Sequence, residues 1–210
     1  MKKHLMVIVT GAVIGIAALV LVRFGNPGNM GFCIACFLRD IAGALKLHNA
    51  GVVQYMRPEV IGLIIGAFAL AVVKKEFKPR GGSAAFTRFT LGFFVMIGAL
   101  VFLGCPLRMF LRLGAGDLNA VFGLVGFIAG IVIGIFFLNK NFSLSRAHNQ
   151  SKQEGVIPII FMIVFFVLLV AFPSALAFSE KGPGAMKAPI FLALAIGLVV
   201  GGLAQRSRMC

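Results

Sequence analysis

The stretch "MGFCIACFLRD", from Met30 to Asp40, places two cysteines and an Arg-Asp pair after a long apolar run, Leu5 to Val22. A segment that crosses a membrane needs about 20 predominantly apolar residues. This stretch is amphipathic, and a break rich in Gly and Asn separates it from the run before it. Because backbone that ends at membrane depth persists only inside protein or beside a cavity, residues Gly31 to Leu47 are predicted to form a re-entrant half-helix.

The composition around this stretch is that of an integral membrane protein. Of the 210 residues, 60% are hydrophobic and 12% are charged, and the mean hydropathy is +1.03. A soluble domain has about half apolar and about a quarter charged residues. The net charge of +14 resides mostly in short segments between apolar runs, which is typical of topology signals. The expected partner is therefore a lipid bilayer, and no nucleic acid is expected.

Six apolar runs are predicted to be transmembrane helices, although two of them, 59–73 and 188–203, are slightly short. A second amphipathic segment, Cys105 to Leu113, is predicted to be another re-entrant half-helix. The predicted fold class is an all-α polytopic membrane protein with about six transmembrane helices and two re-entrant half-helices. The six runs are roughly 5–22, 59–73, 88–103, 118–138, 156–178 and 188–203.

The orientation follows from the basic segments. Lys74 to Arg88 and Asn139 to Glu154 are rich in Lys and Arg, and the positive-inside rule places such segments in the cytoplasm. The N-terminus is therefore predicted to be cytoplasmic in an inner membrane, with both half-helices entering from outside. The first apolar run also fits a signal peptide, but no A-x-A cleavage site follows it, so a retained helix is favoured.

The two ends of the chain resemble each other. The first run leads to "NMGFC", which ends at Cys33, and the sixth leads to "SRMC", which ends at Cys210. In the predicted topology these copies cross the membrane in opposite directions, which indicates an inverted repeat. Residues 1–155 would form the first repeat, and 156–210 a linking helix and the start of an incomplete second repeat. Such repeats place a site between broken helices near the membrane midplane.

The cysteines are the first candidates for chemistry. Cys33 and Cys36 form a C-x-x-C, but no βαβ pattern surrounds them, and a zinc site would need more ligands. The simplest alternative is that each cysteine is a small buried apolar residue. Three of the four lie beside apolar runs, which favours free thiols over disulfides. Since residues i and i+3 share a helix face, Cys33 and Cys36 are expected to face one cavity. No metal or cofactor is expected.

Arginines accompany these cysteines. Cys105 precedes Pro106, which fits the first turn of a helix, where free N–H groups and the helix dipole favour an anion. Arg108 and Arg112 share a face of this half-helix, and Arg206 lies close to Cys210. Thiols match a soft, polarizable atom and arginines offset negative charge. The predicted pathway for a small soft anion therefore consists of Cys33, Cys36, Cys105, Cys210, Arg108, Arg112 and Arg206.

Arg39 and Asp40 are interpreted differently. A charge at membrane depth costs at least about 2.5–3.5 kcal/mol on insertion scales, so it is usually paired or faces water. The adjacent charges are predicted to form a structural ion pair that holds the first half-helix in place. Asp117 is expected either to cap the next helix or to pair with Arg112.

Glycines recur at three- or four-residue spacing within the long runs. Small residues at this spacing allow helices to pack closely in lipid, so a packing role is predicted. They are Gly11, Gly15, Gly62, Gly66, Gly123, Gly126, Gly130 and Gly134.

Four motifs together resemble a known family. The chain is similar to the YedE/YeeE family of sulfur-transport membrane proteins, and more narrowly to its selenium-linked YedE branch. The resemblance covers essentially all 210 residues. The motifs are "GFCIACFLRDIAGALKLH", "FLGCPLRMFLRLGAGDLNA", "FSEKGPGAMKAP" and "GLAQRSRMC".

This resemblance implies long helices around re-entrant half-helices, with cysteines that pass thiosulfate by weak S–H contacts. The family cysteines match Cys33, Cys105 and Cys210, whereas Cys36 lies outside the thiosulfate-branch pattern. The expected function is transport of a selenium or sulfur anion, without enzyme activity and with a cytoplasmic sulfur or selenium carrier as a possible partner. The family pattern continues through a second Arg-Asp pair and a second "CPLR", so the sequence is expected to be truncated.

Two alternatives stay open from the residues. One is a membrane thiol-redox or sulfur-transfer enzyme that uses Cys33 and Cys36 as a redox pair. The other is a membrane subunit that does not itself transport.

Overall fold

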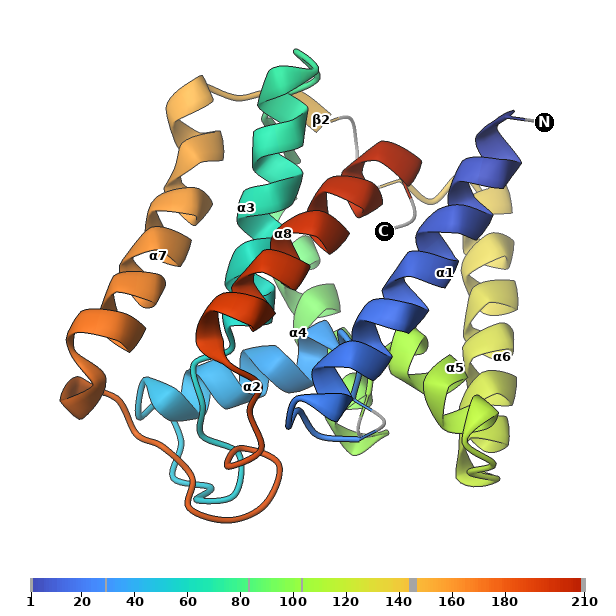
Figure 1. Cartoon of the computed structure of the whole chain (residues 1–210). Coiled ribbons are helices and arrows are strands. Elements are labelled where there is room, and N and C mark those ends of the chain that lie inside the picture. Colours follow the sequence, from blue (N-terminus) through green and yellow to red (C-terminus); the bar gives the residue numbers. More distant parts are fainter. Residues whose placement is uncertain (1, 29, 83, 103, 144–146, 209–210) are drawn as a thin grey trace.

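The protein is mostly helical in a computed structural model that describes residues 2–28, 30–82, 84–102, 104–143 and 147–208 (Figure 1). A pair of short strands and one 3-10 turn accompany the helices. The helices are α1 (Lys2–Arg23), α2 (Ile34–Ala44), α3 (Pro58–Val73), α4 (Ala85–Val101), α5 (Pro106–Gly114), α6 (Asn119–Asn139), α7 (Lys152–Ala171) and α8 (Ile190–Ser207), and the 3-10 turn is η1 (Pro173–Ala175).

Each of the six predicted runs contains one long helix, but α3 is too short for a full span. Its 16 residues extend about 24 Å at 1.5 Å per residue, against a hydrocarbon core of about 30 Å. Among the described residues, five helical stretches are long and apolar enough to cross a membrane, one fewer than predicted. They are Leu5–Arg23, Ala85–Gly114 (which includes α4 and α5), Asn119–Asn139, Lys152–Ala171 and Ile190–Ser207.

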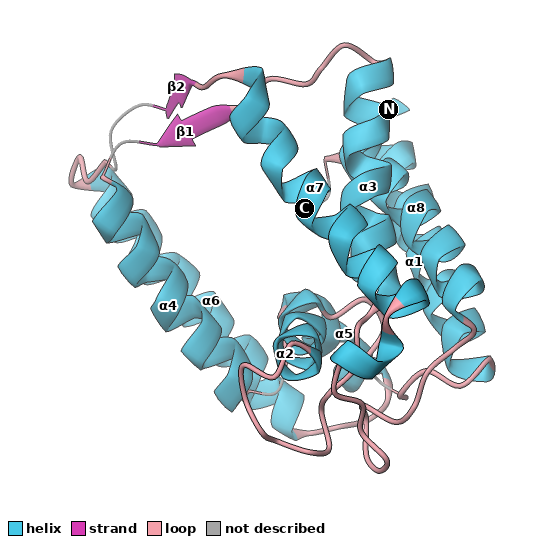
Figure 2. Ribbon diagram, turned by 90° about the vertical axis from the view of Figure 1, so that its left-hand side faces the viewer, coloured by secondary structure: helices cyan, strands magenta, loops and turns pink. Residues whose placement is uncertain are grey.

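A small sheet departs from the all-α prediction. β1 (Arg80–Gly82) and β2 (Ala147–Asn149) pair antiparallel, with Gly81 opposite His148. Each strand has three residues, fewer than the four to eight that a sequence pattern needs to indicate a strand. The pair joins the two basic segments that the sequence analysis places on one side of the membrane (Figure 2).

The long helices give the molecule two distinct ends. Both termini and the β1–β2 pair lie at one end (Figure 1). The chain passes from α1 to α3 through α2 at the other end, and from α4 to α6 through α5 there as well (Figures 1 and 2). Each short helix thus connects two long helices whose adjoining ends lie at the same end of the molecule.

Glycines bring α3 and α8 into close contact. A Cβ added to Gly62 would lie 2.9 Å from the backbone nitrogen of Leu198, and one added to Gly66 would lie 2.8 Å from the Leu198 carbonyl carbon. The predicted packing role is therefore confirmed for these two glycines. It is not supported within this chain for five others, where an added Cβ would meet no atom of another part of the described chain within 4 Å: Gly11, Gly15, Gly126, Gly130 and Gly134.

Replacing Gly66 by alanine is expected to lower the free energy of unfolding by about 1–3 kcal/mol, because the added methyl group meets backbone that cannot rotate away. Gly130→Ala on α6 is the matched control, since its methyl group meets nothing. The control should be neutral or up to about 1 kcal/mol more stable. Unfolding of the purified variants in detergent measures both, and equal effects would show that the α3–α8 contact does not depend on glycine.

The surfaces of α4 and α6 are almost entirely exposed. Ala120 is the one buried residue among those of α6, and α4 has none. Their exposed side chains are large and apolar, for example Phe86, Phe122 and Val101, each at least 80% exposed. A helix that is hydrophobic all round is suited to a lipid environment.

Candidate functional site

The amino ends of α2 and α5 carry the thiols. Cys33 is the N-cap residue of α2 and Cys105 is the N-cap residue of α5, both in extended backbone. Cys36 lies in the first turn of α2, on the same face as Cys33. Pro106 occupies the first turn of α5, as predicted, where its missing N–H is not needed.

Three thiols and one guanidinium meet at these helix ends, and we call this group the thiol cluster: Cys33, Cys36, Cys105 and Arg108. Cys33 Sγ lies 3.0 Å from Cys36 Sγ. The backbone N–H of Cys105 donates to Cys33 Sγ across 3.4 Å, and Arg108 Nη1 donates to Cys36 Sγ across 3.1 Å. The structure therefore brings together four of the seven predicted pathway residues, with Cys33 in the middle.

The surroundings of the thiol cluster are apolar. Cys33 is fully buried and Cys36 is 2% exposed, whereas Cys105 is half-buried. The cluster packs against buried hydrophobic residues of several helices, among them Phe37, Met56 and Ile61. In such a setting an electrostatic contact is stronger than in water, because the local dielectric is low.

The electrostatics of the cluster favour negative charge. Neither N-cap side chain makes a capping hydrogen bond, and the first N–H groups of a helix lack intrahelical partners. Each helix amino end contributes roughly half a positive charge. Arg108 adds a full charge beside Cys36. The arrangement suits a thiolate or a small anion between the two half-helices.

Arg112 has partners outside the thiol cluster. Its Nη2 lies 2.7 Å from Asp117 Oδ2, its Nη1 donates to the carbonyl oxygen of Phe102 across 2.8 Å, and its guanidinium lies over the Phe102 ring. Arg112 thus joins α5 to the ends of α4 and α6. The structure does not place it among the residues that contact the thiols.

Asp117 forms the expected pair with Arg112, while the N-cap residue of α6 is Leu118. Besides pairing with Arg112, Asp117 accepts at Oδ1 from the backbone N–H of Asn119, the first residue of α6, across 3.0 Å. The hydrogen bond from Arg112 and then that from Asn119 hold the pKa of the Asp117 carboxyl below its usual value. A lowered carboxyl pKa contributes stability above the unfolded pKa, which is lost as the pH falls through the folded pKa.

The Arg39–Asp40 pair is present and has an unpredicted third member. Arg39 Nη2 lies 2.8 Å from Asp40 Oδ1, and Arg57 Nη2 lies 2.7 Å from Asp40 Oδ2. Arg39 is 20% exposed, whereas the side chains of Asp40 and Arg57 are fully buried. Asp40 therefore joins α2 to the residue just before α3.

Arg57 also holds the loop before α8. Its Nη1 and Nη2 donate to the carbonyl oxygens of Met186 and Pro183, across 3.1 and 2.7 Å. Its guanidinium lies 5.0 Å from the centres of the Phe37 and Tyr55 rings. This residue was not predicted from the sequence. The available signal was a charge directly before a proline at the start of an apolar run, where a counter-charge is required.

A second missed contact fixes the same loop. The Asn26 side-chain amide donates to Glu59 Oε1, and Asn26 Oδ1 accepts from the backbone N–H of Ala188 across 2.8 Å. Glu59 is 1% exposed. Its first-turn position in α3 lets the helix dipole stabilise its charge. The loop is thus held by a buried arginine and by a buried asparagine.

The remaining predicted pathway residues lie elsewhere. Arg206 is exposed in the last turn of α8 and lines a pocket of about 500 Å³ with Met6 and Val7 of α1. That end of α8 is the one away from α2 and α5 (Figure 1). Cys210 lies outside the described residues. Within the described ranges, no group of three or more His, Cys, Asp and Glu side chains is placed to hold a metal ion.

Comparison with known protein families, with curated proteins and with solved structures finds no match for this chain.

Proposed function

We propose that this chain is a membrane transporter for a small selenium- or sulfur-containing anion, which passes along thiols in a narrow pathway. The observation that carries the proposal is the thiol cluster. Its cysteines come from two half-helices about 70 residues apart in sequence, and one guanidinium joins them in an apolar setting. A purely structural cysteine would not need a second and third thiol or a charge beside it.

The chemistry of the cluster suits transient binding of a soft anion. A thiol is a weak donor with a polarizable sulfur, so it offers a selenium or sulfur atom a contact that breaks easily. Arg108 and the two helix amino ends offset the charge that the anion brings into an apolar region. Conduction requires binding strong enough for entry and weak enough for release. Several weak S–H contacts meet that requirement better than one tight site.

The proposed pathway runs through the thiol cluster on the outer side and through Arg206 and Cys210 on the inner side. In this proposal α2 and α5 are re-entrant half-helices that enter from outside, and the N-terminus is cytoplasmic in an inner membrane. The opposite directions of α1 and α8 support the inverted repeat (Figure 1). The similarity to the YedE/YeeE family supports the substrate class and a cytoplasmic carrier as acceptor. Arg112 has a structural role in this proposal, because its guanidinium is paired with Asp117.

Uptake measurements test the proposal. Cells that produce the protein should accumulate thiosulfate or selenite above cells that produce the variant Cys33→Ala/Cys36→Ala/Cys105→Ala at the same membrane level. Uptake of each anion in the presence of the other shows which of the two the protein prefers. If the wild type and the triple variant accumulate both anions equally, then the thiol cluster is not a transport pathway.

A membrane redox enzyme is the second candidate, because the Cys33 and Cys36 sulfurs are 3.0 Å apart. A disulfide bond is about 2.05 Å long. In this alternative the two thiols form a disulfide and pass two electrons and two protons to an oxidised sulfur or selenium substrate. Thiol trapping during turnover distinguishes the candidates. Transport predicts that both thiols stay reduced, whereas the enzyme predicts that they alternate between reduced and oxidised forms.

A further inference from the structure

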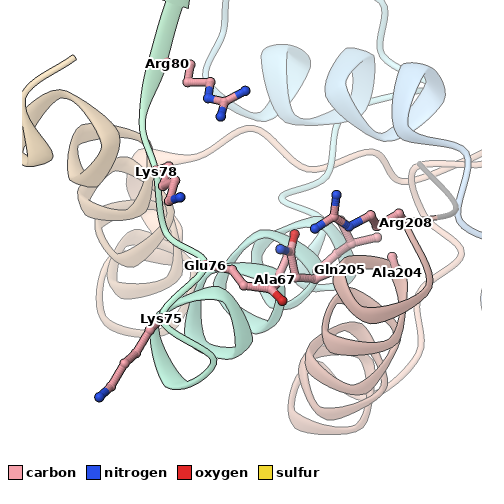
Figure 3. Close-up of a pocket in the computed structure, with 9 residues that line it drawn as sticks. Ala67, Lys75, Glu76, Lys78, Arg80, Ala204, Gln205 and Arg208 are labelled. Atoms are coloured by element: carbon pink, nitrogen blue, oxygen red, sulfur yellow. The ribbon is translucent and has the colours of Figure 1, made fainter. Parts of the chain in front are cut away.

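A second polar site lies at the opposite end of the molecule from the thiol cluster. A pocket of about 730 Å³ opens between the carboxyl ends of α3 and α8 and the segment that leads to β1 (Figure 3). None of its lining residues belongs to the proposed pathway. They are Leu63, Ala67, Lys75, Glu76, Lys78, Arg80, Ala204, Gln205 and Arg208.

The pocket is strongly positive. The lining contains four cationic side chains and one carboxylate, which gives it a net formal charge of +3. The carboxyl ends of α3 and α8 each add roughly half a negative charge, so about +2 remains. In the part of the chain that the structure describes, the salt bridges involve other residues, and these four cations have no carboxylate within 4.0 Å. Their charge is available to a ligand.

The backbone places three of these cations, Lys78, Arg80 and Arg208, along the pocket (Figure 3). Lys75 and Arg208 follow the ends of α3 and α8 in the left-handed conformation, with φ of 55° and 54°, which costs a residue with a Cβ some energy. The turn after α3 is closed by the Glu76 N–H, which donates to the Ala71 carbonyl across 2.8 Å. In Figure 3 the chain then carries Lys78 and Arg80 along the pocket, Arg208 lies beside Gln205, and Lys75 points outward.

The wall below the cations is apolar. Leu63 and Ala67 of α3 and Ala204 of α8 line it and are half-buried. A ligand that fills this pocket therefore needs a negative head and an apolar body. The pocket also lies at the carboxyl end of α8, which is long enough to cross a membrane, and the end of such a helix is at the level of the lipid head groups.

We propose that this pocket binds the phosphate head group of an anionic phospholipid, with an acyl chain against the wall of α3 and α8. Basic pockets between helices at the membrane surface are suited to such head groups. Free phosphate has the negative charge of such a lipid, but it has no apolar body that could contact the wall of α3 and α8. The inference does not rest on the transport function, because the pocket and the thiol cluster share no residue.

Lipid binding by the full chain in detergent, followed by native mass spectrometry, tests this inference. The wild type should bind phosphatidylglycerol at least about tenfold more tightly than phosphatidylcholine, and Lys78→Gln/Arg80→Gln/Arg208→Gln should lose that preference. The matched control is Lys140→Gln/Lys152→Gln/Lys181→Gln, which removes the same charge from exposed residues outside the pocket. The control should keep the preference, and the unfolding temperature of each variant without lipid shows that it is folded.

Three outcomes would overturn the inference. The wild type could bind both lipids equally, or the two triple variants could lose the preference equally, which would indicate diffuse surface charge. Alternatively, millimolar inorganic phosphate could displace phosphatidylglycerol completely from the wild type, which would indicate a site for a free anion. A failure of uptake with lipid binding intact would affect the proposed function alone.

Discussion

Replacing Cys33 by alanine is expected to reduce uptake by at least about tenfold, the largest effect of any single thiol. Cys33 is the middle member of the thiol cluster, in contact with both Cys36 Sγ and the Cys105 backbone. A hydrogen bond to a charged group contributes about 1.5–3 kcal/mol, which corresponds to a factor of roughly 10–100 in binding. Loss of the central thiol would therefore interrupt the proposed pathway between α2 and α5. Radiotracer uptake into proteoliposomes gives the rate.

Cys36→Ala is the matched control for this prediction. It removes a thiol from the same turn of α2 but leaves the contact between Cys33 and Cys105 in place. Its uptake should fall less than that of Cys33→Ala. Because Cys33 is fully buried, each rate must be divided by the amount of folded protein. If Cys33→Ala transports at the wild-type rate after this correction, the central position of Cys33 has no functional meaning.

Arg57→Ala is expected to cause the largest loss of stability, about 3–5 kcal/mol in the free energy of unfolding. Removing one partner of a buried ion pair leaves the other charge uncompensated, which accounts for that magnitude. Asp40 would keep only Arg39, which is partly exposed, and the carbonyl groups of Pro183 and Met186 would lose their donor. Unfolding in detergent measures the loss of stability, and proteolysis of the 179–189 loop measures the loss of its contacts with Arg57.

Two controls separate the effect of the buried charge from a general effect of substitution on stability. Lys181→Ala removes an exposed cation from the same loop and should change stability by less than about 0.5 kcal/mol. Asp40→Asn combined with Arg57→Met should cost less than the sum of the two single changes, since neither charge is then left alone. Strict additivity would show that Asp40 and Arg57 do not stabilise each other.

The long helices and the two short amphipathic helices were predictable because hydropathy and charge act locally. Each of the six runs overlaps one long helix, α2 lies inside its predicted segment, and α5 extends one residue beyond its own. The bounds of α3 were predicted to within one residue, but the reason why it does not begin earlier was not. Its apolar run stops at Pro58, and Arg57 belongs to a buried polar network that a hydropathy pattern cannot reveal. The three-residue strands were too short to leave any pattern.

The candidate site was predictable in its residue types but not in its grouping. Cys33 and Cys105 were selected from their positions beside helix breaks, yet nothing in the spacing indicates that Arg108 contacts Cys36. Arg112 has the same residue type and lies on the same face, and both a substrate role and a pair with Asp117 were compatible with the sequence. In the structure Arg112 donates to Asp117, which lies five residues further along the chain. The spacing of residues alone does not show whether an arginine pairs with a nearby carboxylate or binds a ligand.

The contacts of Arg57 also have a consequence for the order of events during synthesis. Its two carbonyl partners lie 126 and 129 residues further along the chain. At about 5–20 residues per second, they leave the ribosome on the order of 10 s after Arg57 does. During that interval the buried partners available to Arg57 within the described part of the chain are Asp40 and the rings of Phe37 and Tyr55. The loop before α8 therefore reaches Arg57 last, and the contacts that join α2, the start of α3 and this loop are complete only after the residues before α8 have been synthesised.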